Sequence, residues 1–467
     1  MVQIEAPTRV DPPAVEKLAS RLRGRVVGPT DDGYQQARAV WNGMIDRRPS
    51  LIAQCAGVAD VIDALAVARE HGLPVTVRGA GHSVAGKSAS DAGFVIDLGP
   101  MRWVHVDPES RIARVGPGAV GGDLDRETQV HGLATTGGTD STTGVIGLTL
   151  GGGAGFLTRR FGLAIDNLLG AYVVLADGRV VHASETDNAD LFWALRGAGG
   201  SFGIVTAVEL RLHPLGPELM VAQAFHPYED AGTALRFFRD FTSDAPDEVG
   251  FYALAVNVPP LPGFPEAFHG KTAIALIASY AGSLADGERA LRPIGEFGEP
   301  MLKVVAAMPY AALQQSFDAA NPAHERYFWK SHYLGSLPDE VIDVFVAHVD
   351  PLPGPFSAAW FEPLGGALGR VPAEATAFPH RDAAYNFAIS AGWTDAADDE
   401  RAIAWTRAFH DAMTPWATGG VYANYVGLDD VGHLRANFGN NLARLREVKA
   451  KYDPHGVFGR WKGNATS

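Results

Sequence analysis

The chain has 467 residues, of which 46% are hydrophobic, and a formal net charge of −14. Such a length is long for one domain of typical size and allows two sizeable cores. The 39 basic residues form no concentrated run, so the composition argues against a nucleic-acid or anionic-membrane partner, because either requires a basic patch. The single cysteine, Cys55, excludes an intrachain disulfide and is interpreted as a buried small apolar residue.

The amino terminus shows no targeting pattern. Residues 1–9 lack a basic region followed by an apolar core, so we expect no secretory leader and a cytoplasmic protein. The most apolar stretch, residues 144–157, is interrupted by glycines. It is too short to span a bilayer, and we expect no membrane partner.

Up to about residue 212, short helices alternate with short β-runs, which predicts an α+β fold. The expected helices cover residues 15–22 and 61–70, and the expected strands cover residues 25–27, 75–77, 94–97 and 112–115. Further on, the apolar run 171–175, the turn pair Asp177-Gly178 and the run 179–181 predict a β-hairpin.

A glycine turn with a histidine follows the β-run at residues 75–77. It consists of Arg78, Gly79, Ala80, Gly81, His82 and Ser83, and we call it the histidine turn. Such a turn exposes backbone N–H groups and lets a diphosphate approach closely, because no Cβ stands in the way. Histidine adds nothing to a turn sterically, which favours a role for its ring at a bound ligand. The alternative is a tight turn with an incidental histidine.

A longer glycine-rich segment, residues 137–157, comes next and is called the glycine block. Apolar residues punctuate it regularly, whereas flexible linkers are polar. So many glycines lose much chain entropy on folding, which makes sense where backbone must lie against a large flat ligand. The glycine block therefore favours a cofactor site over a linker.

A proline and glycine cluster at residues 213–217 marks a boundary, after which longer strands are expected. The predicted strands cover residues 221–225, 251–258, 272–280, 327–334, 357–361 and 385–392, and the predicted helices lie near residues 285–291, 338–348 and 400–413. In the last helix Trp405, Phe409 and Met413 share one face, which indicates core packing.

Aromatic residues are concentrated at residues 327–333. Alternation places Tyr327, Trp329, Ser331 and Tyr333 on one face of the strand and the residues between them on the other. One of these faces is expected to line a substrate cleft, and the pattern does not decide which. No spacing of His, Cys or carboxylates suggests a metal, and no Gly-x-Gly-x-x-Gly opens a helix for a nicotinamide cofactor.

With these motifs in place, most of the chain resembles the FAD-linked oxidases of the berberine-bridge-enzyme-like, or vanillyl-alcohol-oxidase, family with a PCMH-type FAD-binding fold. The matching segments are residues 78–83 with 95–98, 144–155, 162–168, 190–206, 422–425, 441–445 and 451–454. The resemblance implies a two-domain α+β fold. It implies an FAD-binding domain over residues 1–212, a substrate domain over 213–418 with an antiparallel sheet covered by helices, and a return to the FAD domain over 419–467.

The resemblance implies a covalent flavin. In similar enzymes the histidine of the first turn bonds to the 8α-methyl of FAD, and this role falls on His82. Many relatives add a cysteinyl link, but Asp140 stands at that position, which implies a single histidyl link. Thr143 stands where relatives place a gatekeeper for oxygen, and its small size favours an oxidase. The implied cofactor contacts are Arg78, Gly79, Ala80, Gly81, Ser83, Thr139, Asp140, Thr143, Gly144, Gly147, Gly152, Gly153, Gly203, Val205 and Asn441.

Hydride transfer to flavin N5 also needs a base that removes the remaining proton. In similar enzymes a tyrosine of the Tyr-x-Asn-Tyr segment lies near the substrate, which makes Tyr422 and Tyr425 the first candidates; the alternative is aromatic packing. The strand at 385–390 offers Asn386, with Ala388 where relatives direct an acidic or amide residue. Glu362 is the remaining carboxylate that could face the pocket, unless it is a solvated strand end.

The resemblance implies an FAD-dependent oxidase. It would take a hydride from a small organic substrate, such as an alcohol, a sugar or a secondary metabolite, and molecular oxygen would reoxidise the flavin to give hydrogen peroxide. Two alternatives stay open: a flavin dehydrogenase with another electron acceptor, and a non-redox flavin-binding protein. The sequence leaves the substrate and the choice between monomer and homodimer undecided.

Overall fold

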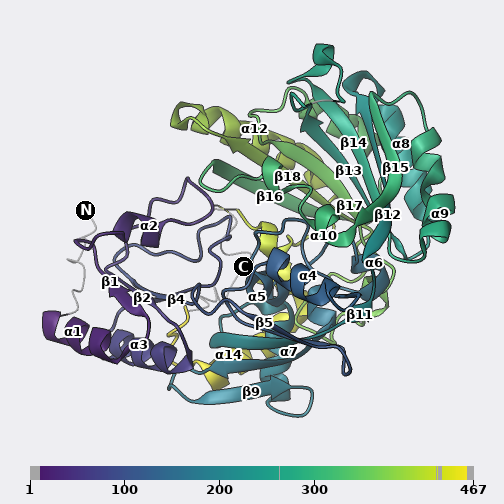
Figure 1. The fold of residues 1–467 in the computed structure, drawn as a ribbon. Coiled ribbons are helices and arrows are strands. Elements are labelled where there is room, and N and C mark those ends of the chain that lie inside the picture. The colour runs from purple at the N-terminus through teal and green to yellow at the C-terminus, as the bar shows by residue number, and fades with distance from the viewer. Residues whose placement is uncertain (1–10, 262, 428, 430–433, 460–467) are drawn as a thin grey trace.

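The computed structural model describes residues 11–261, 263–427, 429 and 434–459, so residues 1–9, where we expect no leader, lie outside the described part. Within it, the strands form sheets of four, five, seven and two strands. The seven-stranded sheet, called the large sheet, lies with its helices on one side of the molecule, and the amino-terminal elements lie on the other (Figure 1). None of the described helices is both long and apolar enough to cross a bilayer.

The four-stranded sheet contains the strand that leads into the histidine turn. Its strands in spatial order are β1 (Arg25–Val27), β2 (Leu51–Gln54), β4 (Phe94–Asp97) and β3 (Val75–Arg78). The pairs β2–β4 and β3–β4 are parallel. Helices α1 (Pro12–Arg21) and α3 (Val58–Glu70) cover one face of this sheet, and α2 (Tyr34–Arg38) packs on the other. Cys55 is fully buried in this core, as predicted.

The five-stranded sheet is antiparallel and supports the glycine block. Its strands in order are β5 (Val104–Asp107), β6 (Ile112–Val115), β10 (Ile204–Arg211), β8 (Leu168–Val174) and β9 (Val180–Ser184). The pair β8–β9 confirms the predicted hairpin. Its core includes residues of α4 (Gly121–Gln129), α5 (Val145–Leu150), α7 (Ala189–Ala198) and α14 (Leu442–Tyr452). The carboxy-terminal helix α14 thus packs on the same sheet as residues far earlier in the chain (Figure 1).

The large sheet is antiparallel throughout. Its strands in order are β15 (Leu302–Pro309), β12 (Glu218–Pro227), β14 (Thr272–Tyr280), β13 (Val249–Asn257), β17 (Ala358–Pro363), β18 (Tyr385–Trp393) and β16 (Arg326–Leu334). Helices α8 (Ala231–Asp244), α9 (Leu284–Glu296), α11 (Asp339–Val349) and α12 (Asp399–Met413) pack on one face. Phe409 and Met413 are fully buried there beside the half-buried Trp405, which confirms the predicted core stripe.

The other face of the large sheet, called the site face, looks toward the glycine block. Phe156 and Leu157 pack here with Tyr252, Trp360 and other residues of the sheet. Trp329 pairs with Ser390 and Ser331 with Ala388, and Trp329 and Ala388 pack in the core of the site face. This register decides which face of β16 meets the site, a choice that the sequence left open. Residues Tyr327, Trp329, Ser331 and Tyr333 therefore belong to the site face, and Phe328, Lys330 and His332 belong to the helix-covered face.

The remaining described elements are short. They are β7 (Leu133–Ala134), β11 (His213–Pro214), α6 (Thr158–Phe161), α10 (Tyr310–Gln314), α13 (Leu434–Phe438), and the 3₁₀ turns η1 (Ala164–Asp166), η2 (Tyr228–Asp230), η3 (Glu266–Phe268), η4 (Asp318–Ala320), η5 (Leu368–Arg370), η6 (Ala396–Asp398), η7 (Thr414–Trp416), η8 (Ala423–Tyr425) and η9 (Gly439–Asn441).

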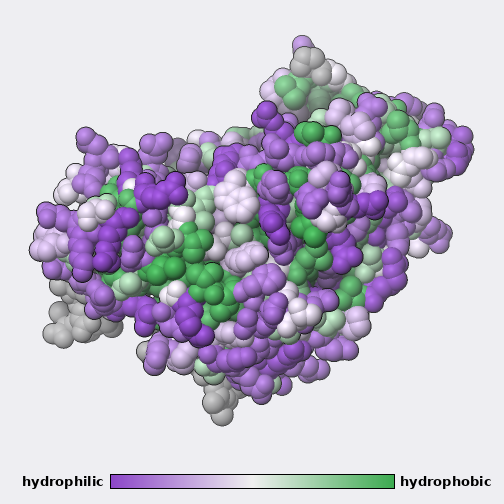
Figure 2. All heavy atoms as spheres, turned by 60° about the horizontal axis from the view of Figure 1, so that its bottom comes forward, coloured by the Kyte–Doolittle hydropathy of each residue, from purple (hydrophilic) through white to green (hydrophobic). Residues whose placement is uncertain are grey.

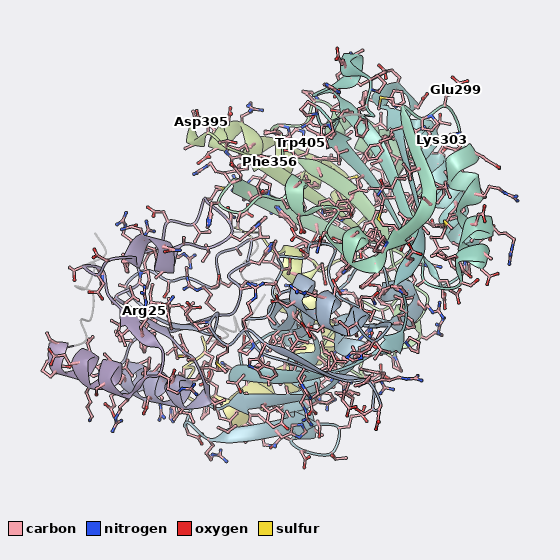
Figure 3. All side chains as sticks on the ribbon, viewed as in Figure 1. Arg25, Glu299, Lys303, Phe356, Asp395 and Trp405 are labelled. Carbon is pink, nitrogen blue, oxygen red and sulfur yellow. The ribbon has the colours of Figure 1, made fainter. Side chains whose placement is uncertain are left out.

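The architecture confirms the predicted α+β class and the antiparallel sheet covered by helices. The structure adds elements that were not predicted, among them strands β2, β5, β10 and β15 and helices α4, α7, α8 and α14. Lys303 lies on β15, at the outer edge of the large sheet near Glu299 and far from Arg25 of β1 (Figure 3). Such a charge hinders pairing of the edge with another chain. The face in Figure 2 is largely hydrophilic, and hydrophobic residues gather in a hollow across its middle.

A buried ion pair joins the segment after the glycine block to the segment before β18. The guanidinium of Arg381 donates to both carboxylate oxygens of Asp166, each at 2.8 Å, and the two side chains are 4% and 10% exposed. Arg381→Leu leaves the Asp166 carboxylate buried without its cation, and we expect a loss of about 3–5 kcal/mol in the free energy of unfolding. Urea denaturation followed by tryptophan fluorescence measures the change.

The matched control is Arg370→Leu, which removes the pair with Asp247 at a site where Arg370 is 64% exposed. This change is expected to cost at most about 1 kcal/mol. Equal losses in the two variants would contradict the assigned importance of the buried pair.

Candidate active site

The histidine turn presents a row of free backbone donors. Gly81 has φ of 76°, a left-handed conformation that favours glycine. In the described part of the chain, no acceptor takes a hydrogen bond from the N–H groups of residues 79–83. Arg78 does not supply a free charge to this row, because its guanidinium is bound to Asp97 at 2.6 and 3.2 Å and both side chains are buried. Arg78 therefore anchors the turn to β4.

His82 lies in a cluster of polar and aromatic side chains. Its Nε2 is 3.3 Å from the hydroxyl of Thr142 and 3.9 Å from a carboxylate oxygen of Asp140. The indole of Trp41 stacks on its imidazole with 4.3 Å between ring centroids and 18° between planes. Burial lowers the pKa of His82, while the charges of Asp140 and Asp318 and its own backbone act in the opposite direction. The imidazole is therefore neutral near pH 7.

The glycine block lies directly against the histidine turn. A Cβ on Gly144 would stand 2.9 Å from the Cβ of Ala80, so only glycine permits this approach. At its far end, the N–H groups of Gly153 and Ala154 donate to the phenol oxygen of Tyr422 at 2.8 and 2.9 Å. The amide of Asn424 donates to the same oxygen at 3.0 Å. Two donors thus fix Tyr422 to the glycine block, and Asn424 adds a third.

A buried carboxylate lies on the site face. Glu362 is 2% exposed, which overturns its interpretation as a solvated strand end. Tyr252 donates to one of its oxygens at 2.8 Å and Asn386 donates to the other at 3.2 Å. Burial raises the pKa of Glu362, and these two hydrogen bonds oppose the rise. Asn386 thus supports the carboxylate from the neighbouring strand.

Around Glu362, several buried polar atoms have no hydrogen-bond partner among the described residues. Their side chains share the site face by strand register. They are Trp329 Nε1, Ser331 Oγ, Tyr333 OH, Asn386 Oδ1 and Ser390 Oγ. Leaving a buried polar group unpaired costs about 1–3 kcal/mol. A concentration of such atoms on one face is typical of a surface that meets a polar ligand.

Aromatic contacts connect His82 to the tyrosines. Trp41 lies edge-on to Trp329 at 6.1 Å, and Trp329 lies edge-on to Tyr425 at 5.3 Å. Tyr425 in turn contacts Tyr422 at 4.8 Å. Burial raises the pKa of Tyr425 well above its usual value, and the nearby Glu362, Tyr422 and Tyr333 add to the rise. The candidate residues His82, Tyr422, Tyr425, Glu362 and Asn386 therefore belong to one connected region.

The other predicted contacts lie in several different places. Asp140 and Thr143 line one small cavity with Gly137 and Gly138 of the glycine block, and Thr139 immediately precedes Asp140. Val205 lies on β10 in the core of the five-stranded sheet, and Gly203 immediately precedes that strand. The amide of Asn441 already has partners within the protein, because it donates to the carbonyls of Ala373 and Thr376 at 3.0 and 3.1 Å. Gly147 lies exposed on α5, and Gly152 lies buried beside Tyr422.

Four residues of this region were not among the predicted ones: Trp41, Thr142, Tyr252 and Asn424. Asn424 and Thr142 lie inside motifs that the sequence shows, next to residues that were selected. Trp41 and Tyr252 carry no local signal, because their contacts involve residues far away in the chain.

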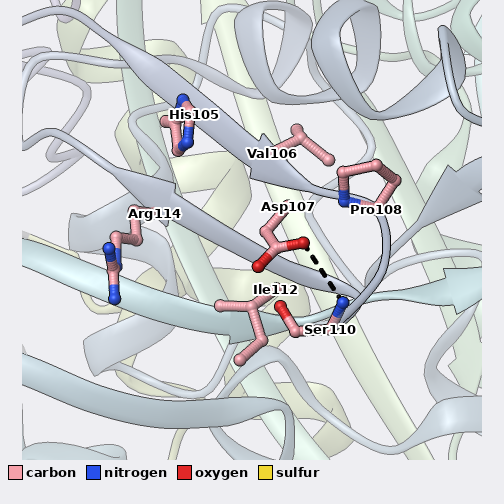
Figure 4. Close-up of a pocket in the computed structure, with 7 residues that line it drawn as sticks. All are labelled: His105, Val106, Asp107, Pro108, Ser110, Ile112 and Arg114. Carbon is pink, nitrogen blue, oxygen red and sulfur yellow. Dashed lines mark hydrogen bonds between the residues drawn. The ribbon is translucent and has the colours of Figure 1, made fainter.

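Neither of two cavities is lined by the aromatic rings that connect His82 to Tyr422. One of about 260 Å³ lies on the β5–β6 hairpin (Figure 4), where Asp107 accepts a hydrogen bond from the Ser110 N–H. Its lining contains none of the predicted site residues. The other, of about 20 Å³, is lined by α4 and the glycine block and is large enough for about one water molecule. Asp125 lines this second cavity.

The site fits a flavin dinucleotide. The unengaged N–H groups after β3 form the kind of backbone nest that holds a diphosphate. The close approach of Gly144 to Ala80 leaves backbone, rather than side chains, at the wall of the site. A neutral histidine beside this nest suits attachment to the flavin ring.

Comparison with known proteins agrees. A model of the FAD binding domain matches residues 49–184, and one described as berberine and berberine like matches residues 421–463. The chain is 32% identical to the FAD-linked oxidoreductase pgmH of Aspergillus terreus over 96% of this chain and 95% of that protein. It is 43% identical to (R)-6-hydroxynicotine oxidase of Paenarthrobacter nicotinovorans, but over 44% of this chain and 45% of that protein.

The fold also resembles that of a protein of known structure. It matches 6-hydroxy-D-nicotine oxidase from Arthrobacter nicotinovorans with a TM-score of 0.82 at 27% identity, covering 94% of this chain and 96% of that chain. Fold and site together define an FAD-dependent oxidoreductase. The chain belongs to the FAD-linked oxidoreductases with a berberine-like carboxy-terminal segment, which confirms the family that the motifs indicated.

Asp125, which lines the small cavity beside the glycine block, makes the stability of the protein depend on pH. It is 5% exposed, one of its oxygens has no partner among the described residues, and burial raises its pKa from 3.8 to about 7. Between these values the folded chain keeps a proton that the unfolded chain loses, so stability falls as pH rises through this window. Asp125→Asn removes the titration, and we expect the variant to gain stability over wild type between pH 5 and pH 8, by a few kcal/mol on the order of the pKa shift.

Thermal unfolding at pH 5 and pH 8 measures this difference. Asp177→Asn, in the exposed turn of the β8–β9 hairpin, is the control and should follow wild type at both pH values. An Asp125→Asn protein whose melting temperature changes with pH as wild type does would contradict the assignment.

Proposed function

We propose that this protein is an oxidase with FAD bonded to His82, which oxidises a small organic molecule and is reoxidised by dioxygen. Bound FAD would supply the acceptor for a substrate hydride at N5 and the route for its electrons to dioxygen, with hydrogen peroxide as the product. The observation that carries the proposal is the run of ring contacts from His82 through Trp41 and Trp329 to Tyr425. It links the residue that would hold the flavin to the residues that would handle the substrate proton.

Flavin binding and substrate binding would fall on different sheets. Residues 1–212 and 419–467 would form the flavin-binding unit, and residues 213–418 would cover it with the site face of the large sheet. The packing of α14 with α7 in the core of the five-stranded sheet supports this division. The N–H groups of residues 79–83 would hold the diphosphate. The absence of a cysteine at Asp140 leaves His82 as the single point of attachment.

Tyr425 is the better candidate for the catalytic base. The oxygen of Tyr422 already accepts two N–H groups of the glycine block and one of Asn424, and we assign it to fixing that block, although these donors also oppose the rise of its pKa on burial. Tyr425 is half-buried, and its ring lies edge-on to both Trp329 and Trp360. Its raised pKa means that the hydroxyl carries a proton at rest. To take a proton from the substrate, Tyr425 must therefore pass its own proton on.

Glu362 is suited to receive that proton. Its charge is one of the causes that raise the pKa of Tyr425, so the two groups are electrostatically coupled. Burial raises the pKa of Glu362 itself, which makes it a better proton acceptor than an ordinary carboxylate. Tyr252 and Asn386 hold both of its oxygens in place. Glu362 would thus accept the proton that Tyr425 releases.

The site face indicates the kind of substrate. Indole and phenol rings alternate there with unpaired hydroxyl and amide groups. Such a wall suits a small molecule that offers both a cyclic apolar surface and hydroxyl or amine groups. Relatives named as nicotine and sugar oxidases are consistent with that class.

A direct test begins with a screen of cyclic alcohols, amines and sugars for anaerobic loss of the flavin absorbance. Readmission of air should restore the oxidised spectrum and release about one hydrogen peroxide per substrate oxidised. Slow restoration without peroxide would instead indicate a dehydrogenase with another acceptor. No bleaching by any compound that the protein binds would contradict the redox function.

The residue assignment is tested with the substrate that emerges. Tyr425→Phe should slow anaerobic flavin reduction by about 100-fold or more, as expected for loss of a general base. Glu362→Gln should slow the same step by a smaller factor. Tyr228→Phe is the control, because its hydroxyl bonds to the carbonyl of Val346 on the helix-covered side. An unchanged reduction rate in Tyr425→Phe would remove this tyrosine from the mechanism.

A further inference from the structure

We propose that Asp140, acting through Thr142, prepares His82 for its bond to the flavin. The inference rests on the proposed histidyl bond and goes beyond it, because it assigns a role to the residue that stands in place of the second covalent ligand. Asp140 and Thr142 are positioning residues that set which imidazole nitrogen attacks and stabilise the charge that follows.

The hydrogen bonds determine the proton positions. The Thr142 hydroxyl is 2.6 Å from Asp140 Oδ1, and the Thr142 N–H donates to the same oxygen at 2.9 Å. An ionised carboxylate can only accept, so the single hydroxyl proton of Thr142 goes to Asp140. The threonine oxygen, 3.3 Å from His82 Nε2, is then left to accept. Nε2 therefore carries the ring proton, and Nδ1 keeps its lone pair.

The charge of Asp140 reaches the ring as well. Its second oxygen lies 3.9 Å from Nε2, and the two side chains are 13% and 16% exposed. At this degree of burial, a carboxylate interacts with a cation more strongly than it does in open water. The turn that carries Asp140 is also fixed, because Ser141 donates to Asp318 through its N–H at 2.9 Å and its hydroxyl at 2.6 Å.

The ring plane is fixed from the other side. The indole of Trp41 is 5% exposed and stacks on the imidazole of His82. Its backbone N–H donates to Gly81 in the histidine turn, and its Nε1 donates to Asn321. With one edge of the ring held by Thr142 and one face held by Trp41, the imidazole has a single orientation from which to react.

Formation of the histidyl bond explains why a carboxylate beside His82 is useful. Bond formation joins Nδ1 to the 8α-methyl carbon of FAD, and that carbon loses one hydrogen as a proton. The alkylated ring is at first a cation that still carries the Nε2 proton. Asp140 stabilises this cation, and the Nε2 proton is lost afterwards. The two electrons left on the flavin pass with two protons to dioxygen, which becomes hydrogen peroxide.

The test follows covalent incorporation rather than turnover. Full-length protein is produced in riboflavin-starved cells and mixed with FAD in air. The denatured protein is then sampled over time for flavin fluorescence and intact mass. Asp140→Asn and Thr142→Val should both bind FAD but form the covalent adduct about tenfold or more slowly, in line with the loss of a hydrogen bond to a charged group. Thr142→Ser keeps the hydroxyl and should restore the wild-type rate.

Two controls separate the possible failures. Asp177→Asn makes the same chemical change in an exposed turn and should incorporate flavin as wild type does. His82→Ala should bind FAD without any adduct. If wild type forms no adduct although it binds FAD, the histidyl bond itself is refuted. If wild type forms the adduct and both Asp140→Asn and Thr142→Val match its rate, the role of Asp140 is refuted while the proposed oxidase stands. A folding defect in Asp140→Asn leaves the Thr142→Val and Thr142→Ser pair to decide.

Discussion

The site depends on one buried amide that joins the histidine turn to the large sheet. Asn42 is fully buried, and its Nδ2 donates to the carbonyl of Val84, just after the turn, and to that of Tyr327 on β16. Its oxygen accepts from the N–H of Tyr327 at 3.1 Å. A buried amide that loses these partners leaves several polar groups unsatisfied, so the relative position of turn and strand is tightly specified. Trp41 is thereby held between His82 and the site face.

The distribution of satisfied polar groups then separates framework from site. Where the segments meet, buried groups are matched: Arg381 with Asp166, Tyr422 with the glycine block, and Asn441 with the carbonyls before β18. On the site face, hydroxyl and indole groups are left unmatched. Matched groups stabilise one arrangement of the chain, and unmatched ones keep binding capacity for a ligand. We therefore propose the site face as the substrate surface on the basis of this contrast, and not on the volume of any cavity.

Local signals in the sequence predicted much of this. The Asp177-Gly178 turn predicted the β8–β9 hairpin, and alternation on β16 separated its two faces, although only register with β18 showed which one meets the site. Helix α8 was not predicted, although Ala234, Leu235 and Phe238 recur at helical spacing. His82 and Tyr425 lie in motifs, so the family resemblance reached them. The burial of Glu362 and the stack of Trp41 on His82 arise from long-range packing, which local sequence does not encode.

His82 is the proposed point of attachment of the flavin, and a peptide map tests this attachment. Trypsin cleavage after Arg78 and Lys87 releases residues 79–87, in which His82 is the only histidine. In a digest of denatured protein prepared with FAD, we expect flavin fluorescence to elute with this peptide and fragmentation to place the added mass on His82. Flavin recovered free, or on any other peptide, while residues 79–87 elute unmodified, would contradict it.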